Sequence, residues 1–182
     1  MFYSTTYPSP IGILTLVCDG NNLVGLWMHK QKYFGASISE KVQERSNMPV
    51  LIAAKQWLDR YFAGDKPALS QLPLAPAGSE FRQRVWKILC EIPYGEVVTY
   101  GSIAKKIAVQ MNKDVVAAQA VGGAVGHNPI SIIIPCHHVV GSNGSLTGYG
   151  GGIKTKIKLL ELEGVDISNL FIPKSLLGEV IR

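Results

Sequence analysis

A long uncharged stretch constrains this chain more than any other feature. No aspartate, glutamate, lysine or arginine occurs between Asp114 and Lys154, although the 182 residues include 18 basic and 13 acidic ones. A membrane span needs about 20 consecutive apolar residues, and the glycines, prolines and histidines of this stretch interrupt every apolar run well before that length. We therefore expect the inner wall of a binding site, where backbone amides and helix ends contact a ligand.

Composition and charge place the chain among ordinary folded proteins. Apolar residues make up 47% of it and charged residues 17%, which is typical of a compact globular protein. Basic residues exceed acidic ones in residues 1–78 (seven against five) and in residues 79–163 (nine against six), so no basic stripe stands out. The net charge of +5 is therefore only a weak indication of a polyanionic partner.

The N-terminus and the cysteines indicate a cellular setting. Residues 1–12 lack the basic segment and following apolar segment of a leader peptide, so a cytoplasmic location is expected. Cys18, Cys90 and Cys136 are an odd number, which predicts reduced thiols and no disulfide framework. The loose candidates for a metal, Cys18 with His29 and Cys136 with its neighbouring histidines, lack paired ligands at the spacing of a structural zinc site, so we expect no zinc.

The first part of the chain predicts strands followed by a helix. β-rich runs cover residues 3–7, 11–20 and 23–28, with turn residues between the last two. Apolar residues at helical spacing predict a helix over residues 50–64. Three prolines in residues 66–78 then indicate a linker and a domain boundary.

The second part predicts three helices. Ser79 is an N-cap candidate for a helix that ends at Pro93, and Thr99 is one for a second helix. A third helical segment, residues 115–125, has almost no bulky side chains, so either a packed helix or the wall of a nucleic acid could approach it closely. The last two helices fit a helix-turn-helix, a pattern that has many false positives on its own.

A thiol and two imidazoles follow the most apolar run of the chain. Ile132–Ile134 are expected to form a buried strand that ends at a proline and delivers Cys136 to a site. A reactive cysteine needs a base, and His137 is the nearest candidate, through a turn or a bridging water. A carboxylate from a later helix could orient that base, and the candidates are Glu161 and Glu163. The alternative is a buried structural thiol, the commoner fate of a cysteine.

Three blocks in the second part resemble, in order and spacing, the C-terminal domain of the O6-alkylguanine-DNA alkyltransferases, also called methylated-DNA–protein-cysteine methyltransferases. They are "GSEFRQRVWKILCEIPYGEVVTYGSIAKKIA", "AVGGAVGHNPISIIIPCHHVVGSNGSLTGYGGG" and "KLLELEG", and they lie within residues 78–165. The strand-rich first part resembles that family's ribonuclease-H-like domain. The resemblance implies an α/β chain: a small ribonuclease-H-like N-terminal domain with its linker (residues 1–77), and a mostly helical C-terminal domain with a helix-turn-helix (residues 78–182).

The resemblance implies single-turnover DNA repair by direct reversal. A methyl or small alkyl group would move irreversibly from O6 of guanine, or O4 of thymine, in double-stranded DNA to a cysteine of the protein. The damaged base would leave the stack to reach its pocket, and the small residues of the third helix would enter the minor groove. No metal, cofactor or membrane would be needed, and a monomer is expected.

The resemblance also assigns individual residues. Cys136 would be the acceptor, His137 its water-mediated base and Glu163 the carboxylate that orients the base. Tyr100 would donate to the purine ring, and Asn128 would fix the active-site turn. The remaining residues would contact DNA or line the base pocket: Gln119, Ala120, Gly123, Val139, Tyr149 and Gly150.

Two positions depart from the family pattern. Gln119 stands where an arginine normally fills the gap left by the flipped base, and it lacks the cation and the planar guanidinium. His138 replaces the arginine of the usual "PCHR", so a permanent charge gives way to a titratable one. We expect DNA engagement to be weaker or differently specific, and the thiolate to be slightly less stable.

Two other functions compete with repair. A lesion-binding module would sense the same damage without transfer, but such proteins lack the cysteine that is present here as Cys136. A cysteine hydrolase that uses Cys136, His137 and Glu163 would turn over small esters or peptides, and the helix-turn-helix would then have no role. Repair is favoured because the cysteine motif lies in the expected structural context.

Overall fold

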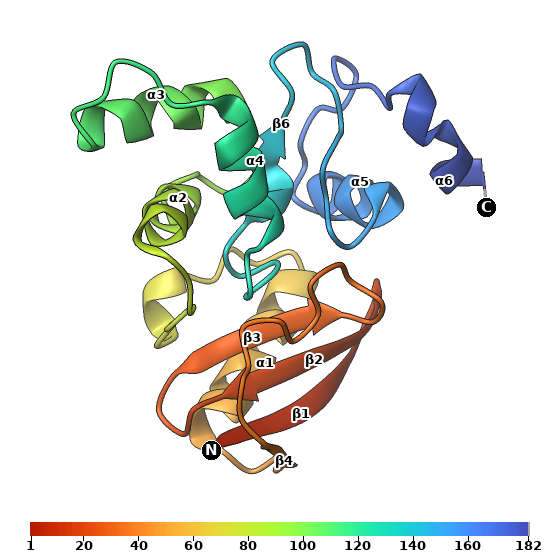
Figure 1. Cartoon of the computed structure of the whole chain (residues 1–182). Coiled ribbons are helices and arrows are strands. Elements are labelled where there is room, and N and C mark those ends of the chain that lie inside the picture. Colours follow the sequence, from red (N-terminus) through yellow and green to blue (C-terminus); the bar gives the residue numbers. More distant parts are fainter. Residues whose placement is uncertain (182) are drawn as a thin grey trace. The chain divides into compact units, whose positions relative to one another are not determined.

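The computed structural model describes residues 1–181, and these form two compact units. The first unit holds residues 1–78 together with residues 129–133 (Figure 1). The second unit holds residues 79–128 and continues from residue 134. The predicted division into domains after residue 77 stays a prediction. It did not anticipate that residues 129–133 belong to the first unit.

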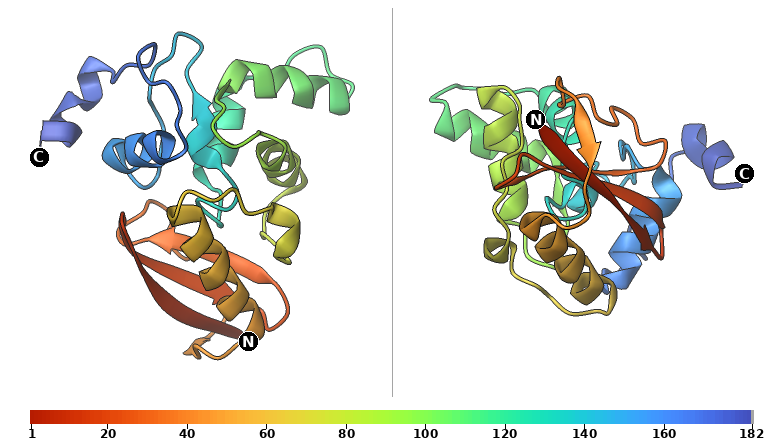
Figure 2. Two further views of the ribbon diagram at one scale, coloured as in Figure 1. Left: turned by 180° about the vertical axis from the view of Figure 1, so that it is seen from behind. Right: turned by 90° about the horizontal axis from the view of Figure 1, so that it is seen from below.

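The first unit is a four-stranded sheet with one helix against it. Its strand order is β3-β2-β1-β4, and the bounds are β1 Phe2–Ser9, β2 Gly12–Cys18, β3 Leu23–Met28 and β4 Val42–Glu44. The first three strands are antiparallel neighbours, whereas the short β4 runs parallel to β1 at the edge. Helix α1, Pro49–Phe62, covers one face of this sheet (Figure 2). The three predicted strands and the predicted helix are confirmed, while β4 was not predicted.

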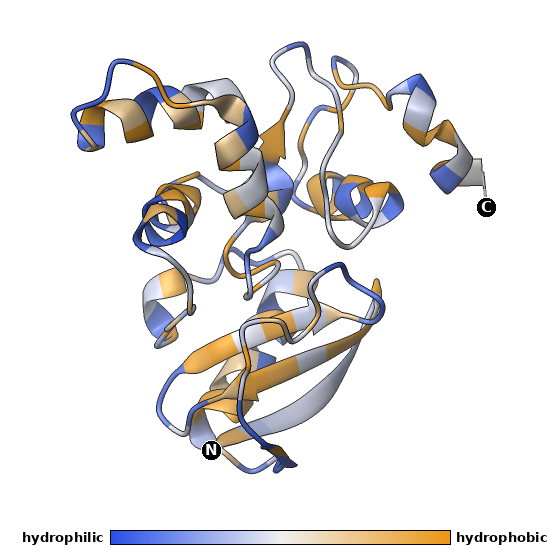
Figure 3. Cartoon of the chain, in the orientation of Figure 1, coloured by the Kyte–Doolittle hydropathy of each residue, from blue (hydrophilic) through white to orange (hydrophobic). Residues whose placement is uncertain are grey.

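Apolar side chains of the sheet and of α1 form the core of the first unit. Figure 3 shows apolar residues along β2 and β3, and Leu16 and Leu26 of these strands have no exposed surface. Helix α1 buries Leu51, Ala54 and Leu58, which recur at helical spacing and lie on one face. Burial of each leucine contributes about 1.5–3 kcal/mol, which offsets the modest propensity of such a short helix.

Residues 129–133 pair with β3 in the first unit but do not form the buried strand expected at Ile132–Ile134. The Leu26 N–H donates to the Pro129 carbonyl (2.8 Å), and the Ser131 N–H donates to the Leu26 carbonyl (3.0 Å). The chain then turns, with Ile132 at φ +71° and the Ile133 N–H bonded to the Ser131 carbonyl (2.8 Å). The strand prediction was wrong because a β-branched run can be buried in a turn as well as in a strand, and burial was the only property that the pattern indicated.

The second unit is mostly helical. Its helices are α2 Glu80–Cys90, α3 Tyr100–Gln110, α4 Ala118–Gly126, α5 Ile153–Leu162 and α6 Leu177–Ile181. A two-stranded parallel pair, β5 Val98–Thr99 and β6 Val139–Val140, lies among them. Within residues 1–181 no helix has both the length and the apolarity needed to cross a membrane.

The helix-turn-helix expected from the sequence is present as α3 and α4, which pack on each other and on α2. The predicted caps are also confirmed, since the hydroxyl of Ser79 accepts from the Arg82 N–H and that of Thr99 from the Ser102 N–H. Helix α4 begins at Ala118, three residues later than the start expected at residue 115. Helix α2 also binds α4 through a hydrogen bond from the Trp86 indole to the Ala124 carbonyl (2.8 Å).

The segment after α5 is tied to the loop at residues 141–148. The Leu146 N–H donates to the Phe171 carbonyl (2.8 Å), and the Phe171 N–H donates to the Gly144 carbonyl (3.1 Å). Gly144 has φ +87°, and a Cβ there would lie 2.5 Å from the backbone oxygen of Asn169. Only glycine therefore fits at this crossing of two backbones.

We predict that Gly144→Ala destabilises the second unit more than Gly164→Ala does. Gly164 also has a positive φ, +73°, but a Cβ there meets nothing within 4 Å, so its substitution should cost only the conformational term, about 1 kcal/mol. At Gly144 the overlap with a backbone atom should add about 1–3 kcal/mol. Urea unfolding of both variants would test this. Equal losses of the free energy of unfolding would show that the backbone at Asn169 can shift without an energetic penalty.

Candidate active site

The turn that carries Cys136 is closed by hydrogen bonds on both sides. Cys136–His138 form one turn of 3-10 helix between Pro135 and β6, and the cysteine is 6% exposed. The Cys136 N–H donates to the Ile134 carbonyl (2.8 Å), and the same carbonyl accepts from the Asn128 side-chain amide (2.8 Å). Asn128 is 3% exposed, so its amide is a fixed part of the turn. This contact supports the role expected for Asn128.

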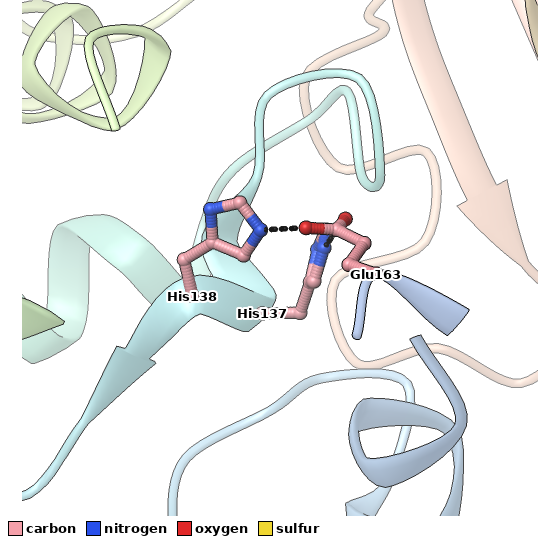
Figure 4. A group of neighbouring side chains, drawn as sticks. All are labelled: His137, His138 and Glu163. Atoms are coloured by element: carbon pink, nitrogen blue, oxygen red, sulfur yellow. Dashed lines mark hydrogen bonds and ion pairs between the residues drawn. The ribbon is translucent and has the colours of Figure 1, made fainter. Parts of the chain in front are cut away.

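One carboxylate accepts hydrogen bonds from both histidines of the turn. Glu163, the residue that ends α5, accepts at Oε1 from His137 Nε2 (2.7 Å) and at Oε2 from His138 Nε2. The Gly95 N–H also donates to Oε2 (3.1 Å). Figure 4 shows the two imidazoles directed at the opposite oxygens of the carboxylate. The other candidate from the sequence, Glu161, is exposed on α5 and has no part in this group.

Burial and this shared carboxylate set the charges of the group. Burial lowers the pKa of His137 to about 4, although the hydrogen bond to Glu163 acts in the opposite direction. Burial alone would raise the pKa of Glu163, but the hydrogen bonds from His137 and His138 outweigh it and hold that pKa well below its usual range. The group at rest is therefore a carboxylate anion with a neutral His137.

Two tyrosines and a lysine surround the thiol. Burial and the nearby Cys136 raise the pKa of Tyr100 to about 12 and that of Tyr149 well above its usual value. Burial lowers the pKa of Lys156 to about 8, and Cys136 acts against that shift. All three side chains thus lie close enough to sense a charge on Cys136. Both tyrosines stay protonated near neutral pH and can donate hydrogen bonds.

Lys156 is a site residue that the sequence reasoning missed. Its side chain is fully buried, and Nζ donates to the carbonyls of Val139 (2.5 Å) and Thr147 (3.0 Å). The Thr147 carbonyl also accepts from the Tyr100 hydroxyl (3.1 Å). A signal was available, because Ile153, Lys156, Leu160 and Glu163 follow one another at helical spacing on the buried face of α5.

The residues expected to contact DNA or line the pocket lie in two places. Gln119, Ala120 and Gly123 are exposed on α4, which has no bulky side chain on that face. Val139 is buried in β6 and offers its carbonyl to Lys156. Tyr149 is half-buried with its hydroxyl oxygen enclosed, and Gly150 follows it in the turn before α5.

Cys18, Cys90, His29 and His127 lie outside this group. Cys18 is buried in β2 and Cys90 ends α2, and none of the three cysteines forms a disulfide. His29 is exposed in the first unit, and His127 places Nδ1 2.7 Å from the Gly123 carbonyl at the end of α4.

A metal ion could in principle bridge the donor atoms of His137, His138 and Glu163, which lie within 4.8 Å of one another. Each oxygen of the carboxylate already accepts an imidazole N–H, however. The carboxylate oxygens thus have donors without an ion, and an imidazole held by a carboxylate in this way is the arrangement of an oriented base.

We predict that His137 makes stability fall as the pH is lowered. Its folded pKa of about 4 lies below the usual value, so the unfolded chain binds the extra proton. The stabilisation is complete above about pH 6.5 and is lost as the pH falls toward 4. Between pH 7 and pH 5 the free energy of unfolding should drop by about 2 kcal/mol more in the wild type than in His137→Gln. Urea titrations test this, with exposed His29→Gln as the matched control, and equal drops in all three proteins would contradict it.

Comparison with known proteins places both units in one family. Residues 2–76 match the ribonuclease-like domain, and residues 80–165 the DNA-binding domain, of 6-O-methylguanine DNA methyltransferase. The methylated-DNA–protein-cysteine methyltransferase of Haemophilus influenzae is 42% identical over 90% of this chain and 87% of its own length. The crystal structure of Mycobacterium tuberculosis OGT in complex with DNA is 43% identical, covers 92% of this chain and 94% of its own, and has a TM-score of 0.76. The chain therefore belongs to the 6-O-methylguanine DNA methyltransferase family.

Proposed function

We propose that this protein repairs DNA by direct reversal and that Cys136 is the acceptor. An alkyl group moves from O6 of guanine, or from O4 of thymine, to the Cys136 sulfur, once per protein molecule. The observation that carries the proposal is the buried arrangement of Cys136, His137 and Glu163, in which an oriented imidazole follows a thiol directly. Family membership and a relative solved with DNA support the substrate class.

The bonds change in one displacement. The thiol proton passes to His137, directly or through a water, and the thiolate attacks the alkyl carbon. A bond forms between the alkyl carbon and the Cys136 sulfur while the bond between the alkyl carbon and O6 breaks. The electron pair of the broken bond goes to the guanine. Glu163 stabilises the positive charge that His137 gains. The guanine ring finally takes up one proton, so a thioether and an unmodified guanine result.

Tyr100 suits the departing guanine. Its raised pKa of about 12 keeps the hydroxyl protonated, so it can donate to the purine ring as negative charge develops there. In the structure the Tyr100 hydroxyl donates a hydrogen bond to the Thr147 carbonyl (3.1 Å). A Cβ on Gly148 would lie 2.8 Å from that hydroxyl, so glycine leaves room for the tyrosine at this wall of the pocket.

The exposed, unbulky face of α4 suits the minor groove. Ala118, Gln119 and Ala120 are exposed in its first turn, and small side chains permit close approach of a sugar-phosphate backbone. Gln119 would occupy the gap left by the flipped base. Double-stranded DNA is therefore the proposed partner of a monomeric protein, and the reduced thiols suit the cytoplasm as its location.

The test is to mix the protein with a duplex that contains one O6-methylguanine and to measure the Cys136 peptide by mass spectrometry. We expect one methyl group on that peptide, none on the Cys18 and Cys90 peptides, and unmodified guanine in the DNA. Cys136→Ser should still bind the duplex but should gain no methyl. Tight lesion binding with an unmodified Cys136 would instead make the protein a damage sensor.

We predict that Gln119 matters for duplex DNA but not for a free base. Gln119→Ala should slow transfer from the duplex and leave transfer from free O6-alkylguanine unchanged, because only a duplex has a gap to fill. Gln119→Arg should tighten duplex binding and steepen its dependence on salt by roughly one counterion. Single-turnover rates and binding titrations at several salt concentrations check both effects. An equal loss on both substrates would place Gln119 in the chemistry instead.

A further inference from the structure

The second histidine of the turn is not needed by the chemistry proposed above, yet it is as buried as the first. The side chains of His137, His138 and Glu163 are 0%, 3% and 2% exposed. One imidazole is enough for a base, and one oxygen of Glu163 is enough to orient it. The ring of His138 nevertheless lies edge-on to that of His137, with centroids 4.4 Å apart, and bonds the other oxygen (Figure 4).

The hydrogen bonds define which nitrogens carry protons. Both Nε2 atoms face the carboxylate, so each must be an N–H donor. Among the described residues both Nδ1 atoms are buried without a partner. The hydrogen bonds thus place the proton of each ring at Nε2 and leave Nδ1 of each ring as the acceptor.

Several ionisable groups act on the buried histidines and on Glu163. The charges of His138 and Lys156 lower the pKa of His137. The charge of Glu163 raises the pKa of Tyr149 and Tyr94, after burial. Lys156 places its amine on the carbonyls of Val139 and Thr147, whereas His137, His138 and the Gly95 N–H donate directly to the Glu163 carboxylate.

We propose that His138 is a positioning residue for alkyl transfer, acting through Glu163. The proposal rests on the proposed repair function. His138 fixes Oε2 of Glu163 so that Oε1 faces His137, which keeps the Nδ1 of His137 available as the base.

The experiment measures single-turnover methyl transfer from a lesion duplex in a double-mutant cycle. His138→Leu keeps the bulk but removes the donor, and it should slow transfer about tenfold in the wild-type background. In a Glu163→Gln background, already slower, the same change should alter the rate less than about twofold, because His138 acts through that carboxylate. An equal slowing in both backgrounds, or none in the wild type, would overturn the positioning role.

A second variant tests rescue by another donor and guards against misfolding. His138→Gln keeps an N–H donor for Glu163, so its rate should stay within about threefold of the wild type. If His138→Gln were as slow as His138→Leu, the transfer rate would not depend on the donor to Glu163, and the positioning role would be overturned. His29→Gln, exposed in the first unit, should match the wild-type rate as the control.

Two further readouts separate this proposal from the function beneath it. Lesion-duplex binding and thermal melting of each variant report whether the fold is intact. Nitrogen NMR of the wild type should show His137 and His138 both protonated at Nε2 near pH 8, and an Nδ1–H form of His138 would overturn the assignment. If wild-type protein transfers no methyl group in this assay, the proposed repair function is wrong. The NMR experiment tests the hydrogen bonds of His138 to Glu163 independently of that outcome.

Discussion

The second unit depends on the burial of one negative charge. Removing a carboxylate from water costs several kcal/mol unless its oxygens find donors, and Gly95, His137 and His138 donate to those of Glu163. Those donors come from the loop before β5 and from the cysteine turn, while the carboxylate itself ends α5. Satisfying one anion therefore fixes three separate segments. Gly95 shows how tight the junction is, because a Cβ there would lie 2.9 Å from the Glu163 backbone oxygen.

A second junction meets at the Thr147 carbonyl. It accepts from Tyr100, the first residue of α3, and from Lys156 of α5. One carbonyl thereby ties the loop at residues 141–148 to the helix-turn-helix and to the helix that carries Glu163. The backbone of residues 144–146 is held from the other side by Phe171. Hydrogen bonds thus hold the backbone of this loop on both sides, which is the preorganisation that alkyl transfer requires.

Elements were predicted correctly from the sequence where a helical periodicity coincided with an N-cap residue. The prediction failed where the sequence indicated only that a segment is buried. Ser79 and Thr99 marked their helices because a hydroxyl at an N-cap has one physical use. The apolar run at Ile132–Ile134 did not reveal its turn, since a positive φ at a β-branched residue leaves no trace in composition. Pairing of residues 129–133 with β3 was equally hidden, because contacts distant in sequence leave no local period.

The site was accessible in part. Adjacency of Cys136 and His137 suggested a nucleophile with its base, and the family resemblance selected Glu163 over Glu161. The position of Glu163 on the buried face of α5 gives an independent reason for that choice, and the same periodicity would have found Lys156. The partner of His138 could not be read from the sequence, because two adjacent residues in an extended chain point apart. A single turn of 3-10 helix brings both rings to one carboxylate.

The uncharged stretch between Asp114 and Lys154 can now be explained by what α5 supplies. The stretch includes α4, the turn Cys136–His138 and the loop at residues 141–148. A fixed charge in its buried part would need a partner of its own. Helix α5 instead brings one cation and one anion, Lys156 and Glu163, to the buried group on a single face. Because the stretch itself adds no fixed charge, the thiol lies near a neutral His137 and the protonated Tyr100 and Tyr149. Charge then appears at the site chiefly when Cys136 gives up its proton, and the surrounding donors are already in place to meet it.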